Sequence, residues 1–215
     1  MTKIIRPGVI HMNDPARERV EQLRAELSAA DRSLSAEDTV RLLGTHFLSR
    51  GARRLPPLAV LAAVRCLADA TGGRVADEQT GAVGDVEITL ENDDRVCTVY
   101  EMKQKTVTLD DLDRAVQKVA GRDRRPDNYV FITTDRIDPT VSEQAAKLYD
   151  ATGGTEFAVL DCLGFLRHFL HLFHRRRAAF LDAYQSLLLD QPDSAVRMEL
   201  KQSFLALRAA AITAE

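Results

Sequence analysis

Asp85, Glu101 and Lys103 are the residues whose types and spacing indicate chemistry. Asp85 opens a segment in which apolar and polar residues alternate, which is the two-residue period of a half-buried strand. Glu101 and Lys103 close a second, largely apolar segment that is expected to form the neighbouring strand of a hairpin. If the hairpin turns about Asp93, positions 85 and 101 lie opposite each other, with Cβ atoms about 5 Å apart.

Two carboxylates at that separation repel each other unless a cation lies between them, and hard oxygen ligands favour Mg²⁺ or Mn²⁺. Glu101 and Lys103 are two residues apart on a strand, so their side chains share a face. From that position Lys103 can orient or help to deprotonate a metal-bound water, or offset charge on a phosphate. The three residues together indicate metal-dependent hydrolysis of a phosphodiester. The alternative interpretation is a solvated strand face, on which charged residues are common.

The elements around the hairpin predict a mixed central sheet with helices on both faces, which is an α/β fold. A strongly apolar helix follows Pro56 and Pro57, and a helix capped by Thr108 follows the hairpin. Two short apolar strands then alternate with one further helix. The expected helices of this region are 58–70, 109–120 and 139–152, and the expected strands are 85–90, 96–105, 129–132 and 157–160.

Helices are also predicted before and after this region. Ser35 followed by Asp38 fits a capping box, and apolar residues recur at helical spacing in both flanks. The expected flanking helices are 17–30, 36–47, 163–189 and 194–211. We therefore expect one domain, residues 1–215, made of N-terminal helices (1–55), a catalytic α/β core (56–161) and C-terminal helices (162–215).

The composition is that of a soluble globular protein, with 45% hydrophobic and 28% charged residues. No apolar run approaches the roughly 20 residues of a membrane span, and the first residues lack the apolar segment of a secretory signal. Cys66, Cys97 and Cys162 are widely spaced and are expected to be buried thiols of a cytoplasmic protein. A net charge of −3 and a pI near 6.0 give no overall signal for nucleic acid, so such binding must depend on local features.

Gly84-Asp85, followed by Tyr100-Glu101-Met102-Lys103, resembles the active-site pattern of the PD-(D/E)xK nuclease superfamily. The resemblance covers about residues 56–161, and the core of that family is a helix, three antiparallel strands, a helix and a strand. It implies that Asp85 and Glu101 are metal ligands, that Lys103 is the catalytic lysine, and that the cofactor is Mg²⁺ with Mn²⁺ as a substitute. The proline that commonly precedes the first acid is replaced by Gly84.

More narrowly, Gly81–Ile88 and Leu55–Val64 are similar to type II restriction endonucleases of the SacI kind. This resemblance implies cleavage of double-stranded DNA by a homodimer, because cutting both strands of a palindromic site takes two active sites related by a two-fold axis. The family often has a further acid before the first one, and Glu78 is the candidate metal ligand here, with Asp77 beside it.

Two other functions stay open at this point. One is a junction-resolving or repair nuclease of the same fold, which would prefer branched DNA. The other is a catalytically inactive module on this fold that binds DNA or a partner protein. The intact set of Asp85, Glu101 and Lys103 argues against the inactive module, because an idle fold has no physical reason to keep a repulsive pair of carboxylates.

Basic residues after the hairpin are the candidates for contacts with DNA. Arg122, Arg124 and Arg125 form a cluster in the loop that follows the helix capped by Thr108. Lys105 is expected to share the strand face of the catalytic lysine. Lysine and arginine bind phosphates without regard to base sequence. A solvated loop is the alternative interpretation of the arginine cluster.

Other motifs are weaker. Arg50, Arg53 and Arg54 form a second candidate patch for DNA. The chain has no GxxxxGK[ST] or GxGxxG motif, so no nucleotide cofactor is expected. Three histidines recur every third residue, which is not the spacing of a metal-binding pair on a helix, and we expect a helix flank: His168, His171 and His174.

Overall fold

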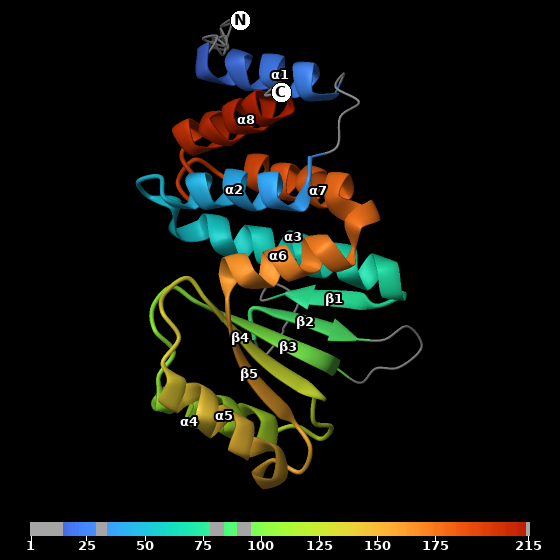
Figure 1. The fold of residues 1–215 in the computed structure, drawn as a ribbon, viewed down its shortest axis with the longest axis vertical. Coiled ribbons are helices and arrows are strands. Elements are labelled where there is room, and N and C mark those ends of the chain that lie inside the picture. The colour runs from blue at the N-terminus through green and yellow to red at the C-terminus, as the bar shows by residue number, and fades with distance from the viewer. Residues whose placement is uncertain (1–14, 29–33, 78–83, 90–95, 214–215) are drawn as a thin grey trace, which may run out of the picture.

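The computed structural model describes residues 15–28, 34–77, 84–89 and 96–213 (Figure 1). Within these ranges the elements follow in the order α1 (Pro15–Ser28), α2 (Ala36–Phe47), η1 (Ala52–Arg54), α3 (Leu55–Thr71), β1 (Arg74–Asp77), β2 (Val86–Thr89), β3 (Val96–Lys103), α4 (Leu109–Ala120), β4 (Asn128–Thr133), α5 (Pro139–Ala151), β5 (Glu156–Asp161), α6 (Cys162–Leu172), η3 (His174–Arg176), α7 (Arg177–Leu189) and α8 (Met198–Thr213).

The strands form one mixed sheet in the order β1-β2-β3-β4-β5. β2 runs antiparallel to both β1 and β3, whereas β4 runs parallel to β3 and β5 runs parallel to β4. The predicted α/β fold with a mixed central sheet is therefore confirmed. The alternation of residues predicted only the hairpin of β2 and β3, and β1 is an addition. The carboxyl ends of β1, β3, β4 and β5 lie at one end of the sheet, because these strands all run in the same direction.

Helices cover both faces of the sheet, as predicted (Figure 1). On one face, Val86, Tyr100 and Ile132 belong to the hydrophobic cluster that includes buried residues of α3 and α6. On the other face, Val99 and Phe131 pack with buried residues of α4 and α5. Successive residues of β3 therefore point to different helical layers, which places Glu101 and Lys103 on the α4 side.

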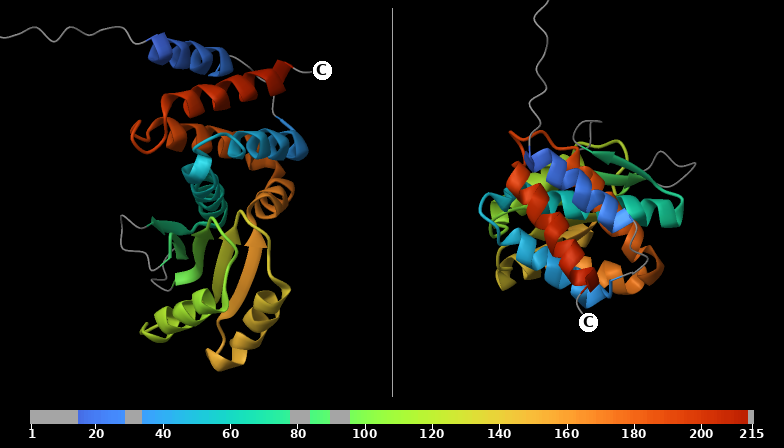
Figure 2. Two further views of the ribbon diagram at one scale, coloured as in Figure 1. Left: turned by 90° about the vertical axis from the view of Figure 1, so that its left-hand side faces the viewer. Right: turned by 90° about the horizontal axis from the view of Figure 1, so that it is seen from above.

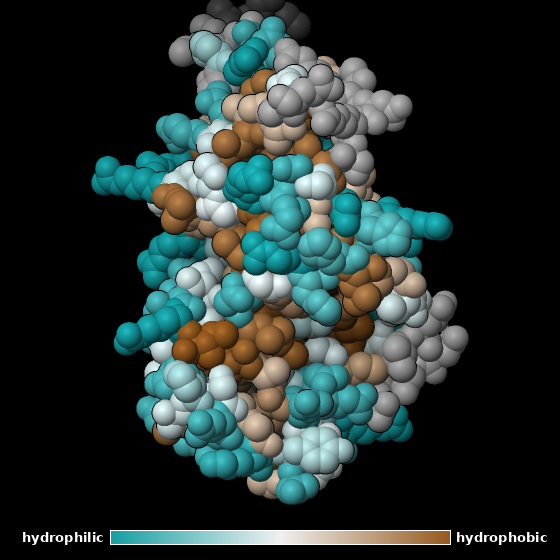
Figure 3. Space-filling view, viewed as in Figure 1, coloured by the Kyte–Doolittle hydropathy of each residue, from teal (hydrophilic) through white to brown (hydrophobic). Residues whose placement is uncertain are grey.

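Helices cover the edge strand β5 less completely near its carboxyl end. On the face seen in Figure 3, apolar side chains gather below α6, over β4 and β5, between more hydrophilic areas. Leu160 of β5 is 39% exposed, and its sheet partner Ile132 is fully buried. Burial at this end therefore stops abruptly at the edge strand.

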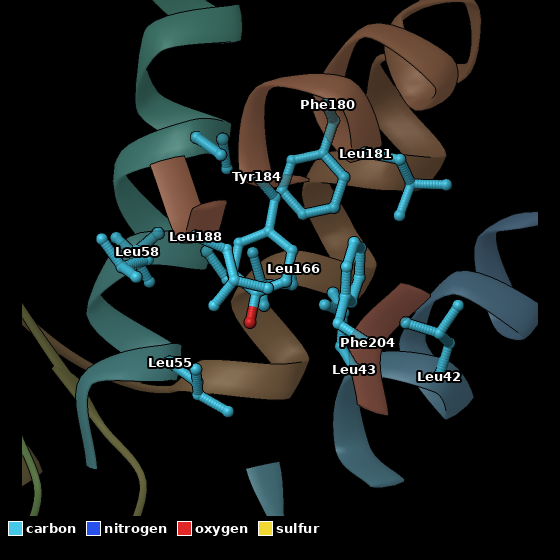
Figure 4. Close-up of a cluster of buried hydrophobic side chains, with 14 of the residues drawn as sticks. Leu42, Leu43, Leu55, Leu58, Leu166, Phe180, Leu181, Tyr184, Leu188 and Phe204 are labelled. Atoms are coloured by element: carbon cyan, nitrogen blue, oxygen red, sulfur yellow. The ribbon is translucent and has the colours of Figure 1, made fainter. Parts of the chain in front are cut away.

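The helical layers above the sheet (Figure 2) share a core with it. Figure 4 shows side chains that the helices contribute to this core. At its centre the His46 ring is fully buried, with Nδ1 3.1 Å from the Tyr184 hydroxyl and Nε2 2.9 Å from the Leu200 carbonyl oxygen. Burial lowers the pKa of His46 although the bond to the Leu200 carbonyl opposes this. In a neutral ring one nitrogen donates and the other accepts, so Nε2 donates to Leu200 and Nδ1 accepts from Tyr184. His46 thereby joins α2 to α7 and α8.

The C-terminal helices differ from the expected ranges. The apolar spacing of 163–189 predicts helix throughout, but α6 ends at Leu172 and Phe173 has the non-helical dihedrals φ −106° and ψ 51°. This break lets α6 and α7 both pack on α3. α8 begins at Met198, four residues later than expected.

The three cysteines were expected to be buried thiols, and two of them are. Cys66, Cys97 and Cys162 are free thiols; the first and last are buried, whereas Cys97 is half-buried. Burial raises the pKa of Cys66, and it raises the pKa of Cys162 to about 12. Over the described ranges, no helix has both the length and the apolar character needed to cross a membrane.

Candidate active site

From Val86 to Ile88 the hairpin has the register that the sequence predicts, and the register shifts by one residue between Ile88 and Thr89. Val86 pairs with Tyr100, and one residue earlier the Asp85 N–H donates a hydrogen bond of 3.0 Å to the Tyr100 carbonyl. The Asp85 carboxylate accepts a hydrogen bond from the N–H of Met102, the residue between Glu101 and Lys103. Asp85 therefore lies just before the start of β2, beside the carboxyl end of β3, and its carboxylate is hydrogen-bonded to the backbone that carries the other two residues.

Glu101 is the centre of a cluster of charges. Its Oε1 accepts from Lys103 Nζ at 2.8 Å, and its Oε2 accepts from Lys118 Nζ at 2.9 Å and from the Tyr129 hydroxyl. Burial alone would raise the pKa of Glu101, but the hydrogen bonds from Lys103, Tyr129 and Lys118 outweigh it and lower the pKa. Glu101 is therefore a carboxylate at neutral pH, held by two ammonium groups and one phenol.

Lys103 lies between two carboxylates. Its Nζ is 2.8 Å from Glu101 Oε1 and 3.0 Å from Asp111 Oδ1. Burial alone would lower the pKa of Lys103, but the hydrogen bonds to both carboxylates outweigh it and raise the pKa. In this arrangement Lys103 keeps its proton. The structure thus favours a role in offsetting negative charge over a role in removing a proton from water.

Asp111 is a member of the cluster that sequence reasoning missed. It is the third residue of α4, where its Oδ2 accepts from the Thr108 N–H at 3.0 Å and the Thr108 hydroxyl accepts from the Asp111 N–H at 3.3 Å. This is a capping box, and the predicted cap Thr108 is confirmed. The other carboxylate oxygen of Asp111, Oδ1, contacts Lys103 Nζ and lies 2.7 Å from Arg114 Nη2. Burial would raise the pKa of Asp111, but the hydrogen bonds from Lys103 and Thr108 hold it well below its usual range.

Sequence reasoning also missed Tyr129 and Lys118 as hydrogen-bond partners of Glu101. Tyr129 of β4 is fully buried and pairs with Val99 of β3. Its ring lies on the face of the sheet that α4 covers, and its hydroxyl donates a hydrogen bond to Glu101. Burial, and then the hydrogen bond to Glu101 and the charges of Glu101, Asp85 and Glu87, raise the pKa of Tyr129. The negative charges of Glu101, Asp85 and Glu87 thus all favour the protonated form of this phenol.

The structure divides the predicted DNA-binding residues into two groups. Arg122 forms an ion pair with Glu87, which is 4% exposed, and Arg125 donates to the Thr152 carbonyl. Arg122 is half-buried, whereas Arg124, Arg125 and Lys105 are exposed. β3 ends at Lys103, so Lys105 lies beyond the strand that was expected to include it. A role of any of the four in binding DNA stays a prediction.

The further acid predicted before Asp85 falls at the edge of the described chain. Glu78 lies outside the described residues. Asp77 is the last residue of β1, where its backbone pairs with Val86, which in turn pairs with Tyr100. Asp77 therefore lies opposite the residue that directly follows Asp85. The prediction that Glu78 is a metal ligand stays open.

Asp85 and Glu101 are the described residues that fit a divalent cation. Their carboxylates are the hard oxygen ligands that Mg²⁺ prefers, and they lie at adjoining strand ends. In the described part of the chain no group of three or more His, Cys, Asp or Glu is placed to hold a metal ion. Mg²⁺ commonly keeps several waters and takes only one or two carboxylates, so a pair of protein ligands is compatible with it. The Lys118 ammonium group contacts Glu101 Oε2 and would have to move away before a cation could bind to that oxygen.

The histidines outside this cluster have other surroundings. His171 Nε2 is 3.1 Å from Glu37 Oε1, which also contacts Arg167 Nε at 3.1 Å. This contact joins α6 to α2 at the protein surface. It offers no connection to the cluster around Glu101.

Neither models of protein families nor curated protein sequences match the chain. The fold and the site define an α/β protein with a cluster of carboxylates and ammonium groups at one end of its sheet.

We expect the Lys118→Gln substitution to tighten the binding of Mn²⁺, because it removes an ammonium group that competes for Glu101. The Lys118 side chain is 40% exposed, and such an exposed pair contributes at most about 1 kcal/mol, which corresponds to about fivefold in affinity. Isothermal titration with MnCl₂ measures the change. Lys147→Gln, which removes an exposed lysine from α5, is the matched control. Equal or weaker Mn²⁺ binding by Lys118→Gln would contradict the competition.

Proposed function

We propose that this protein is a metal-dependent endonuclease of the PD-(D/E)xK type, a hydrolase that cuts phosphodiester bonds of double-stranded DNA. We further propose that it is a cytoplasmic type II restriction endonuclease that acts as a homodimer with Mg²⁺, for which Mn²⁺ can substitute. The observation that carries the proposal is the position of Asp85, whose carboxylate is bonded to the backbone between Glu101 and Lys103. The order of α3, three antiparallel strands, α4 and β4 supports the same class of protein.

The residues of the site have distinct parts in this reaction. Asp85 and Glu101 would hold the cation, which when bound supplies Lewis-acid activation of water and of the phosphate. Lys103, kept protonated by Glu101 and Asp111, offsets the negative charge that develops on the phosphate in the transition state. Because these contacts are formed before the substrate arrives, little reorganisation is needed during the reaction.

Asp111 and Arg114 would act through Lys103 and are positioning residues. Asp111 Oδ1 lies 3.0 Å from Lys103 Nζ, and the capping box fixes the Asp111 side chain to the start of α4. Arg114 contacts the same Asp111 oxygen at 2.7 Å, which offsets the negative charge that Asp111 carries. The position of the catalytic lysine is therefore defined by a strand and a helix together.

A cleavage assay on three DNA substrates tests the proposal. The protein is incubated with plasmid DNA, linear duplex and a four-way junction, each with Mg²⁺, with Mn²⁺ and with EDTA. We expect discrete fragments from the plasmid with either metal and none with EDTA. Preferential cutting of the junction would replace the restriction function by junction resolution. Absence of cutting from all substrates with both metals would contradict a nuclease and leave a binding module on this fold.

A further inference from the structure

The segment between α2 and α3, residues 48–54, is called the arginine loop below. It carries Arg50, Arg53 and Arg54, all with exposed side chains. Figure 1 shows it at the left of the molecule, above the loops that follow β3 and β4. It lies far from the candidate catalytic residues in the sequence but at the same end of the sheet.

A pair of hydrogen bonds joins the arginine loop to the end of β3. Arg53 Nε donates to Gln104 Oε1 at 2.9 Å, and Gln104 Nε2 donates to the Arg53 carbonyl oxygen at 2.6 Å. Gln104 directly follows Lys103 in the chain. The arginine loop is therefore held one residue away from the lysine that we assign to catalysis.

A surface groove of about 580 Å³ lies beside this contact. Its walls are the arginine loop with the end of α2, the residues after β4, and the start of α6. Gln104, Thr134, Asp135 and Asp161 contribute polar groups, and Phe47 and Leu163 contribute apolar surface. Arg53 lies on the wall nearest to β3.

Of the three arginines of the loop, Arg53 lines the groove, whereas Arg50 and Arg54 lie outside its lining. Among the described residues, none of the three arginines of the loop forms an ion pair. The groove also contains two carboxylates, which make local hydrogen bonds. Asp135 accepts from the N–H and hydroxyl of Thr106 at 3.0 and 2.8 Å, and Asp161 accepts from the Gly164 N–H at 2.8 Å at the start of α6.

The arginine loop is held in one shape by contacts with other elements. Gly51 has φ 86°, a left-handed conformation that favours glycine, and Arg197 donates to the Arg50 carbonyl oxygen at 3.2 Å. Leu48, at the start of the loop, is 88% exposed. The loop is thus fixed and carries three exposed arginines, none of them in an ion pair with a described residue, and one exposed apolar side chain. Such a surface matches a phosphodiester strand, which offers anionic phosphates and apolar sugar faces.

We propose that the arginine loop binds the DNA backbone next to the site of cleavage. This inference rests on the proposed nuclease function and assigns the part of the surface that holds the substrate. It gives the main phosphate-binding role to Arg53 and Arg54, rather than to Arg122, whose guanidinium group forms an ion pair with the buried Glu87.

The test compares two double variants that each remove two exposed arginines. Arg53→Gln with Arg54→Gln alters the arginine loop, and Arg175→Gln with Arg176→Gln alters η3, which follows the other end of α6. Binding of a fluorescent duplex is measured by anisotropy with Ca²⁺ in place of Mg²⁺, over a range of salt concentrations. Melting curves by circular dichroism establish that both variants are folded.

We expect the loop variant to bind all duplex sequences more weakly, and the control to bind as the wild type does. Each lost phosphate contact lowers the slope of log K against log salt by about 0.9, so the loop variant should lose up to about two units of slope. Unchanged affinity and slope in the loop variant, with binding by the wild type, would overturn the assignment of the surface and leave the nuclease function intact. Absence of duplex binding by the wild type itself would overturn both.

Discussion

The Lys103→Ala variant is expected to cut DNA about a hundredfold more slowly than the wild type, or worse, while binding DNA with nearly unchanged affinity. Lys103 is an ammonium group held by Glu101 and Asp111, so it cannot ligate a cation, and its charge is placed to act on the phosphate in the transition state. An interaction made only in the transition state affects the rate and leaves ground-state binding unchanged.

Single-turnover cleavage, set beside DNA binding in Ca²⁺, separates the two effects. Lys147→Ala, on the exposed side of α5, is the matched control for loss of a lysine. Asp111 keeps Arg114 and Thr108 as partners in the Lys103→Ala variant, so we expect the protein to fold, which circular dichroism checks. Cleavage at the wild-type rate by Lys103→Ala would show that this lysine is part of a solvated strand face.

The Asp85→Asn variant is expected to lose cleavage and to bind Mn²⁺ at least about tenfold more weakly, because affinity for such cations depends on the number of charged ligands. Asparagine keeps the size of the side chain and an oxygen that can accept a hydrogen bond from the Met102 N–H. The start of β2 should therefore stay in place. The substitution therefore changes charge more than structure. Glu101→Gln is expected to act in the same direction.

Titration with MnCl₂ measures the loss of metal binding separately from activity. Glu143→Gln on α5 removes an exposed carboxylate and serves as the control. If Asp85→Asn and the wild type bound Mn²⁺ equally, Asp85 would not be a ligand. The proposed assignment of the two carboxylates to one ion would then be wrong.

Local patterns predicted the parts of the fold that depend on neighbouring residues. The hairpin register followed from strand alternation and the position of the turn, and Val86 pairs with Tyr100 as that reasoning requires. The helix caps Ser35 and Thr108 also followed from short-range signals, because a cap side chain bonds to a backbone N–H within three residues. The loop that joins β2 to β3 lies outside the described residues.

The remaining features depend on contacts between distant parts of the chain. β1 has four residues and no clear alternation, and its pairing with β2 decides its structure. Lys118 and Tyr129 reach Glu101 only because α4 packs on the sheet and β4 pairs with β3, and neither event is visible in a local pattern. The ion pair of Arg122 with Glu87 likewise joins residues 35 positions apart, so a cluster that reads as a solvated loop contains a partly buried group.

The partners of Glu101 also determine when the site can exist during biosynthesis. The hairpin that carries Glu101 and Lys103 precedes α4 and β4 in the chain, and these two later elements supply Asp111, Lys118 and Tyr129. A nascent chain that ends after the hairpin therefore holds the two residues without the groups that set their charge and position. Because a ribosome adds about 5–20 residues per second, the polypeptide passes through this stage within seconds. Assembly of the site is thus tied to the docking of α4, and a chain truncated before that helix carries an incomplete site.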